Sequence, residues 1–211
     1  MTALRSDVDR ESEWEIKCEY TDTLWRTLEE LVLVRQGAAK DSVDEYLDTK
    51  DGALYCRGYF LRIRDSRSLQ FKYTPDADDA SHIHSVEHRM PWPAEQVSLS
   101  GLPEAARSSL GVTEGRLCWD GEPLVQLIRI EKKRQEWSAG PLVIMIDDVV
   151  DLGRFVELEA SSLDGANILA GLAERFHLEH VPVGYVELML RRSRPSLYRL
   201  GRYVLPKDVA R

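Results

Sequence analysis

Residues 13–19 read Glu-Trp-Glu-Ile-Lys-Cys-Glu, and this stretch decides the fold. Charged residues alternate with Trp14, Ile16 and Cys18 along its whole length. On a pleated strand this alternation sends the charged side chains to one face and the other three to the opposite face. A helix would scatter both sets around its axis. The stretch therefore predicts a β-strand with one charged face and one apolar face.

The same alternation recurs along most of the chain and predicts a protein built mainly of strands. We expect further strands over residues 43–49, 58–65, 69–73, 82–90, 123–137, 142–149, 154–160 and 185–190. Helices are predicted after a cap at Thr21 or Asp22, over 103–110, and over 165–176 with Ser162 or Asp164 as the cap. The fold class that follows is α+β.

Composition places the chain among compact globular proteins. Its 211 residues, 43% of them hydrophobic, are enough to bury a core without metal or disulfide staples. A formal charge of -8 argues against a protein that binds duplex nucleic acid. The three cysteines are widely separated, so we expect buried or half-buried thiols and no disulfide framework. No stretch has the length of a signal peptide or a membrane helix, and we expect a soluble, cytoplasmic protein that contacts no membrane.

The charged faces of these strands carry mostly one sign within each strand. Paired carboxylates stand at Glu13 and Glu15 and at Glu157 and Glu159, and paired cations stand at Arg62 and Arg64 and at Lys132 and Arg134. Because the opposite faces are apolar and need a cover, the charged faces must point at water or at one another. A barrel with a polar lumen satisfies both conditions and would suit a polyanion held by Lys, Arg and a divalent metal. The alternative is a solvated outer sheet face, on which Glu and Lys pair across strands for about 0.2–1 kcal/mol each.

Several short motifs follow one another in an order that resembles a known family. Residues 13–17 read Glu-x-Glu-x-Lys, 46–49 read Tyr-x-Asp-Thr, and 61–64 read Leu-Arg-x-Arg. Later come Phe71-Lys72, Lys132-x-Arg134, Ile146-Asp147-Asp148-Val149, the run from Leu152 to Glu159, and Tyr185-x-Glu187-Leu188. Together they cover roughly residues 11–192 and resemble the CYTH domain of the triphosphate tunnel metalloenzymes, which include class IV adenylyl cyclases, thiamine triphosphatases and inorganic tripolyphosphatases.

The resemblance implies a closed antiparallel tunnel of about eight strands, with a charged lumen and helices packed outside. It implies that Mg²⁺ or Mn²⁺ is held by Glu13, Glu15, Asp147, Glu157 and Glu159. It implies that a triphosphate is held by Lys17, Arg62, Arg64, Lys72, Lys132 and Arg134. In the thiamine triphosphatase branch a lysine and a tyrosine are proposed to activate the attacking water. Lys72 and Tyr46 stand at the matching positions, and we take this pair as the candidate general base.

The chain also departs from the family pattern. Residues 82–89 stand where relatives commonly have Arg-x-Glu-x-Glu, and we carry no role over to them. His82 and His84 could ligate a metal, but we interpret them as ordinary half-exposed histidines. Phe60 stands at the place of a tryptophan in thiamine triphosphatases, which argues against thiamine specificity. Gly184 replaces the usual serine before Tyr185.

The leading hypothesis for function is metal-dependent hydrolysis of a small-molecule triphosphate, either inorganic tripolyphosphate or a nucleoside or other organic triphosphate. The first alternative is a class IV adenylyl cyclase that converts ATP to cyclic AMP and pyrophosphate. The second is a non-catalytic polyphosphate-binding module, against which the complete set of carboxylates argues.

The chain divides into two predicted parts. We predict a tunnel domain over residues 1–192 and a basic C-terminal extension over 193–211, which either is solvated or lies over a tunnel mouth or a partner. Monomer and homodimer both stay open.

Overall fold

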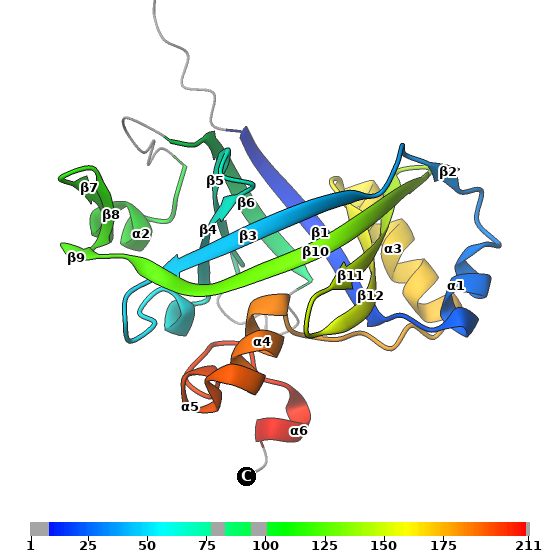
Figure 1. Ribbon diagram of the computed structural model, residues 1–211. Coiled ribbons are helices and arrows are strands. Elements are labelled where there is room, and N and C mark those ends of the chain that lie inside the picture. Colours follow the sequence, from blue (N-terminus) through cyan, green and yellow to red (C-terminus); the bar gives the residue numbers. More distant parts are fainter. Residues whose placement is uncertain (1–8, 77–82, 94–100, 210–211) are drawn as a thin grey trace, which may run out of the picture.

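The computed structural model describes residues 9–76, 83–93 and 101–209, and in these ranges eight antiparallel strands close into a barrel (Figure 1). The strands are β1 (Asp9–Glu19), β3 (Lys40–Asp48), β4 (Tyr59–Arg64), β5 (Ser68–Tyr73), β6 (His84–Pro91), β10 (Val125–Ala139), β11 (Leu142–Val149) and β12 (Gly153–Ala160). Their order is β11-β12-β1-β6-β5-β4-β3-β10, and β10 pairs with β11 to complete the ring. A short strand, β2 (Val34–Arg35), adds to β10. The predicted closed eight-stranded tunnel is confirmed.

Strand β1 shows how the alternating sequence builds the barrel. Glu13 and Lys17 point into the lumen and are buried there, with 4% and 6% of their surface exposed. Ile16 points outward and is buried in an apolar cluster that includes Leu28 and Leu169. Both faces of this strand are therefore buried, one against charged groups and one against helices.

Helices cover the apolar outer face of the barrel beside β1. They are α1 (Asp22–Leu28) and α3 (Leu163–Arg175), which carry Leu28 and Leu169. Thr21 caps α1 by accepting a hydrogen bond from the Leu24 N–H, and Ser162 caps α3 in the same way. One of the two predicted caps is confirmed for each helix.

A small sheet covers the barrel on another side (Figure 1). It consists of β7 (Leu110–Thr113), β8 (Arg116–Trp119) and β9 (Glu122–Pro123), and it lies beside α2 (Glu104–Ser109). Trp119 of this sheet packs in one cluster with Leu61 and Phe71 of the barrel. The sequence analysis did not predict these strands, because two to four residues are too few to display an alternating pattern.

The predicted strand over 185–190 is wrong, because this segment forms the helix α4 (Tyr185–Ser193). In a run this short, strand and helix periods cannot be told apart, and tertiary packing decides. The amino-terminal turn of α4, from Gly184 to Glu187, lines the end of the tunnel cavity. The Lys17 ammonium group lies over the ring of Tyr185 in a cation–π contact, with its nitrogen 4.5 Å from the ring centre. Helix α4 therefore closes one end of the tunnel.

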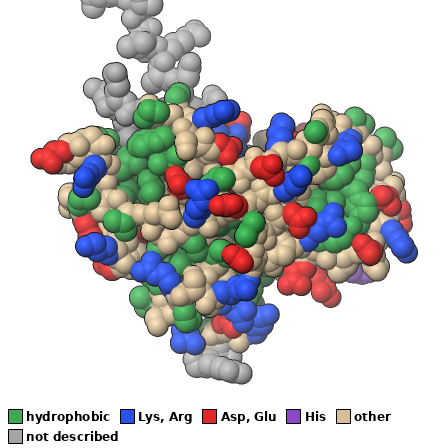
Figure 2. All heavy atoms as spheres, in the orientation of Figure 1, with side chains coloured by type: hydrophobic (Ala, Val, Ile, Leu, Met, Phe, Trp, Pro, Cys, Tyr) green, Lys and Arg blue, Asp and Glu red, His purple; other side chains and the backbone are tan. Residues whose placement is uncertain are grey.

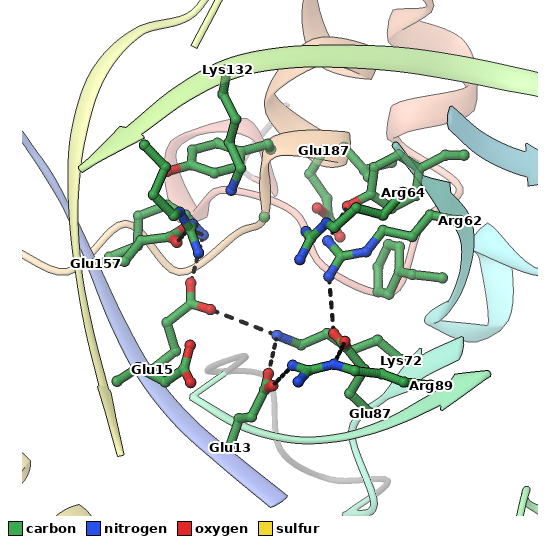
Figure 3. A pocket seen from close by; sticks show the side chains of 18 residues that line it. Glu13, Glu15, Arg62, Arg64, Lys72, Glu87, Arg89, Lys132, Glu157 and Glu187 are labelled. Atoms are coloured by element: carbon green, nitrogen blue, oxygen red, sulfur yellow. Dashed lines mark hydrogen bonds and ion pairs between the residues drawn. The ribbon is translucent and has the colours of Figure 1, made fainter. Parts of the chain in front are cut away.

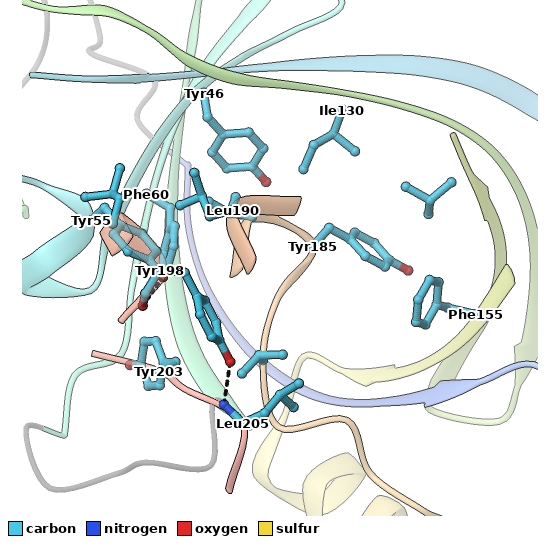
Figure 4. Close-up of a cluster of buried hydrophobic side chains, with 14 residues drawn as sticks. Tyr46, Tyr55, Phe60, Ile130, Phe155, Tyr185, Leu190, Tyr198, Tyr203 and Leu205 are labelled. Atoms are coloured by element: carbon cyan, nitrogen blue, oxygen red, sulfur yellow. Dashed lines mark hydrogen bonds between the residues drawn. The ribbon is translucent and has the colours of Figure 1, made fainter. Parts of the chain in front are cut away.

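The C-terminal segment packs beneath α4 instead of extending into solvent (Figures 1 and 4). It contains α5 (Pro195–Tyr198), which follows directly after α4, and α6 (Pro206–Val209). Tyr198 and Tyr203 are buried in one apolar cluster with Tyr55. The described part of this segment therefore packs against the tunnel domain.

The outer surface differs from the lumen in its charge pattern. Figure 2 shows acidic and basic side chains intermixed over the visible face, as on an ordinary solvated surface. Cys18 and Cys118 are buried and Cys56 is half-buried, all as free thiols, as predicted. No described helix is long and apolar enough to cross a membrane.

Candidate active site in the tunnel

The lumen contains a cavity of about 100 Å³ whose walls are almost entirely charged (Figure 3). The charged lining residues are Glu13, Glu15, Lys17, Arg62, Arg64, Lys72, Glu87, Arg89, Lys132, Arg134, Glu157, Glu159 and Glu187. Tyr46 and Phe60 also line it. Of the residues predicted for the site, the structure brings all but Asp147 to this cavity.

The acidic wall comes from two neighbouring strands. In the β1–β12 ladder, Glu15 is paired with Glu159 and Lys17 with Glu157. Burial, with the nearby charge of Glu13 next in size, raises the pKa of Glu159 to about 7. The pKa of Glu159 is therefore raised first by its removal from water and only then by the neighbouring carboxylates.

The donor chemistry of this wall fits a hard divalent cation. Carboxylate oxygens are the ligands that Mg²⁺ and Mn²⁺ take, and a cation would stabilise the ionised form of Glu159, which burial and the charge of Glu13 disfavour. Glu13 now accepts a hydrogen bond from Lys72 at 3.0 Å, and Glu15 accepts one from Lys17 at 2.9 Å. The described residues contain no ready-made group of three metal ligands. A bound metal would therefore exchange lysine contacts for its own.

Asp147 lies behind the basic wall and not among the lining carboxylates. It is fully buried, and it accepts hydrogen bonds from Lys132 at 2.8 Å and from Arg134 Nε at 2.6 Å. Arg134 Nη2 donates a third, at 2.5 Å, and the Tyr185 hydroxyl a fourth, at 3.2 Å. Arg134 and Asp147 are paired residues in the β10–β11 ladder, a register that the sequence does not reveal. In this structure Asp147 positions the cations.

Asp44 anchors the other part of the basic wall and was missed by the sequence analysis. Arg64 donates to both of its carboxylate oxygens, at 2.7 and 2.9 Å, and Arg62 lies 3.4 Å away. Burial alone would raise the pKa of Asp44, but the two guanidinium groups outweigh burial and hold that pKa well below its usual value. Asp44 stands two residues before Tyr46 on a predicted strand, and this spacing was the sign in the sequence that the two residues share a face.

Strand β6 supplies two further residues that the sequence analysis set aside. Arg89 donates to Glu13 at 2.8 Å, and Arg62 donates to Glu87 at 3.0 Å. Burial opposes ionisation of Glu87, but Arg62 and its other cationic neighbours lower the pKa to about 2. Glu87 and Arg89 stand two residues apart on a predicted strand, which is the spacing that identifies lumen-facing side chains on the other strands.

The two histidines of this segment have no shown role in the cavity. His84 stacks on Trp14, and His82 lies outside the described residues.

The predicted general base pair is present in the cavity but is fully protonated. Burial alone would lower the pKa of Lys72, but Glu13 and Glu15 outweigh it and raise that pKa. Burial raises the pKa of Tyr46, whose hydroxyl accepts a hydrogen bond from Arg62 at 3.0 Å. Lys132 behaves differently, because burial and the neighbouring Arg134 lower its pKa to about 8. The role of Lys72 and Tyr46 as a general base stays a prediction.

Comparison with solved structures finds the same fold at low sequence identity. The PH1012 protein from Pyrococcus horikoshii is 18% identical, with a TM-score of 0.57, and the match covers 83% of this chain and 98% of that chain. A candidate adenylate cyclase from Bacillus halodurans is 19% identical, with a TM-score of 0.57, and the match covers 83% and 95% of the two chains. HpAC1 from Hippeastrum, a candidate adenylyl cyclase described as having a dominant triphosphatase activity, is 17% identical, with a TM-score of 0.56 and coverage of 93% and 98%.

Comparison at the level of sequence gives the family. None of the curated proteins matches this chain. The family model of the CYTH domain matches residues 11–187, which run from the third residue of β1 to the first turn of α4 and include the other seven strands of the barrel in full. The chain therefore belongs to the CYTH domain family.

Proposed function

We propose that this protein hydrolyses a triphosphate inside the tunnel, with a divalent cation on the acidic wall. The observation that supports the proposal is the cavity itself, in which Lys and Arg side chains from β1, β4, β5, β6 and β10 face Glu side chains from β1 and β12. Cationic side chains bind phosphate oxygens, and carboxylates hold the metal that accompanies a phosphate chain. A simple anion-binding module would have no use for the carboxylates.

The size of the cavity favours a compact substrate. Its volume of about 100 Å³ is well below the ~300–1,000 Å³ typical of sites for larger organic ligands. The first turn of α4 closes one end, so a chain of phosphates would enter through the opposite mouth. Inorganic tripolyphosphate fits these limits better than a triphosphate whose nucleoside would also have to lie inside the cavity.

Phosphoryl transfer needs mainly positioning and neutralisation of charge, and this chain supplies both. Arg62 and Arg64 are held rigidly by Asp44, and Lys132 and Arg134 are held by Asp147. Such preorganised cations stabilise the negative charge of the transition state without having to move during the reaction. A metal held by Glu13, Glu15, Glu157 and Glu159 would polarise phosphate oxygens when bound. Lys72, as an ammonium group, would bind the phosphate chain between the two walls.

The direct test is a substrate panel of tripolyphosphate, ATP and thiamine triphosphate, each with Mg²⁺ or Mn²⁺. Orthophosphate, pyrophosphate and cyclic nucleotide are measured separately. We expect orthophosphate from tripolyphosphate, dependent on metal and abolished by chelation. Cyclic AMP as the main product from ATP would replace this proposal with the cyclase, and tight binding without turnover of any substrate would replace it with a binding module.

A further inference from the structure

Glu187 is a buried carboxyl at the closed end of the tunnel, and the reaction proposed above does not use it. It lies in the first turn of α4 and lines the cavity together with Tyr185. Its exposed fraction is 0%, and within the described residues neither carboxyl oxygen has a hydrogen-bond partner. In Figure 3, dashed lines join Glu13, Glu15 and Glu87 to cations, but none reaches Glu187. Glu187 therefore differs from these three lining carboxylates.

The surroundings of Glu187 oppose ionisation of its carboxyl group. Burying an ionised carboxylate without a partner is costly, so the group keeps its proton to a higher pH than a free carboxyl does. Burial raises the pKa of Glu187 to about 7, against the smaller opposing effects of the backbone N–H groups of Glu187 and Gly184, which are directed toward the carboxylate at the start of α4, and of the charges of Lys17 and Lys72. Tyr55 faces it from the 3₁₀ turn η1 (Tyr55–Arg57). The two lysines are hydrogen-bonded to other carboxylates, Lys17 to Glu15 and Lys72 to Glu13.

A phosphate chain that enters from the open mouth ends at this turn of α4. It brings negative charge next to Glu187, and a like charge disfavours the ionised carboxylate further. It also brings oxygens that accept hydrogen bonds, and a protonated carboxyl has one O–H group to donate. The basic side chains Arg62 and Arg64 line the same cavity and would bind other phosphate oxygens at the same time.

Resting on the triphosphate-binding function proposed above, we propose that Glu187 takes up a proton when the ligand binds and donates a hydrogen bond to an oxygen of the phosphate group at the closed end. The closed end then recognises the last phosphate group of the chain through a neutral hydrogen-bond donor. The first turn of α4 supplies no ammonium or guanidinium group at this point. Ligand binding is coupled to protonation of this one residue.

A purely structural role makes different predictions. As the third residue of α4, Glu187 could act through the N–H groups at the start of the helix, as acidic residues in capping boxes do. In that role the carboxylate is ionised with or without ligand. Its replacement would lower the stability of the protein but would leave proton uptake on ligand binding unchanged.

The test is calorimetric titration with the bis-methylene analogue of tripolyphosphate, which cannot be hydrolysed. Wild type, Glu187→Gln and the control Glu174→Gln, which removes an exposed carboxylate from α3, are titrated with Mg²⁺ at pH 7.5 in buffers of different ionisation enthalpy. A carboxyl with a pKa of about 7 is roughly one-quarter protonated at this pH. We therefore expect wild type and Glu174→Gln to take up ~0.75 proton more than Glu187→Gln. The Gln amide keeps an N–H donor, so its affinity at pH 7.5 should stay within a few fold of wild type.

The pH dependence gives a second readout. Above pH 7 the wild-type affinity should fall relative to that of Glu187→Gln by up to about tenfold per pH unit. Infrared difference spectra of the wild type should gain a protonated-carboxyl band when the ligand binds. This measurement does not need the variant, so the test stays valid if the variant folds poorly. Equal proton uptake in wild type and Glu187→Gln, or no such band, overturns the role of Glu187 and leaves the proposed function standing. Absence of any binding by wild type overturns the proposed function and this inference with it.

Discussion

Glu15 and Glu159 are paired residues on neighbouring strands, and both side chains line the same buried cavity. Two carboxylates directly opposite each other destabilise an ordinary sheet. Here the barrel encloses them opposite a wall of Lys and Arg side chains, which come from β4, β5 and β10. Glu15 is paired with Lys17, and the metal proposed above would add positive charge beside Glu159.

Replacing Glu159 with Gln should abolish turnover and leave the fold intact. We expect activity to fall by ~100-fold or more, because even residues that only orient metal ligands contribute about 10–100-fold. The melting temperature should stay equal or rise, since the substitution removes a carboxylate whose ionised form is disfavoured by burial and by the charge of Glu13. Turnover of tripolyphosphate and thermal unfolding are measured beside the surface control Glu174→Gln. Activity close to wild type would remove Glu159 from the metal site.

Asp44→Asn should destabilise the protein in a pH-dependent way. Asp44 is buried and paired with Arg62 and Arg64, and removing one partner of such a network costs about 3–5 kcal/mol. Its pKa is lowered in the folded state, so its contribution to stability is present in full above the unfolded-state pKa of about 4 and is lost as pH falls below it. Urea unfolding of both proteins should therefore differ most at pH 6–7, and the difference should shrink toward pH 3. A difference that is constant with pH would contradict the ionised state of Asp44.

Lys72 should act through its charge. Because Glu13 and Glu15 keep its pKa raised, Lys72→Arg should retain measurable turnover, whereas Lys72→Gln should lose about 100-fold in kcat/KM. The pH–rate profiles of wild type and Lys72→Arg should have the same shape between pH 7 and 9. Neither should show a limb that the other lacks. Such a limb would restore Lys72 as the base that activates water.

The C-terminal segment should contribute to the stability of the tunnel. Tyr203 is buried against Phe60, and its hydroxyl donates to Thr74 at 2.5 Å. Tyr203→Ala should cost about 3–5 kcal/mol in the free energy of unfolding. Tyr203→Phe should cost about 1–3 kcal/mol, because it leaves the Thr74 hydroxyl without this donor. The exposed Leu200, replaced by Ala, serves as the control, and equal unfolding free energies for all four proteins would place the segment outside the cooperative unit.

Much of the site could be predicted because its residues obey one rule. A side chain two positions from a lumen residue on the same strand also faces the lumen. This rule found Glu13, Glu15 and Lys17, and it applied equally to Glu87 and Arg89, which were set aside only because their strand departed from the family motif. It could not separate Asp147 from the lining residues, because its inward side chain is covered by Lys132 and Arg134 from the neighbouring strand.

The sequence by itself determined that this protein has strands with one charged and one apolar face, since the alternation of side chains is a local property of the extended chain. It also determined which charges belong to which strand. Only tertiary contacts set which strands become neighbours and that residues 185–190 form a helix that closes the tunnel. They also bury Glu187 there, where residues 9–76, 83–93 and 101–209 offer its carboxyl oxygens no hydrogen-bond partner. These features depend on contacts between residues far apart in the chain, and no local pattern specifies such contacts.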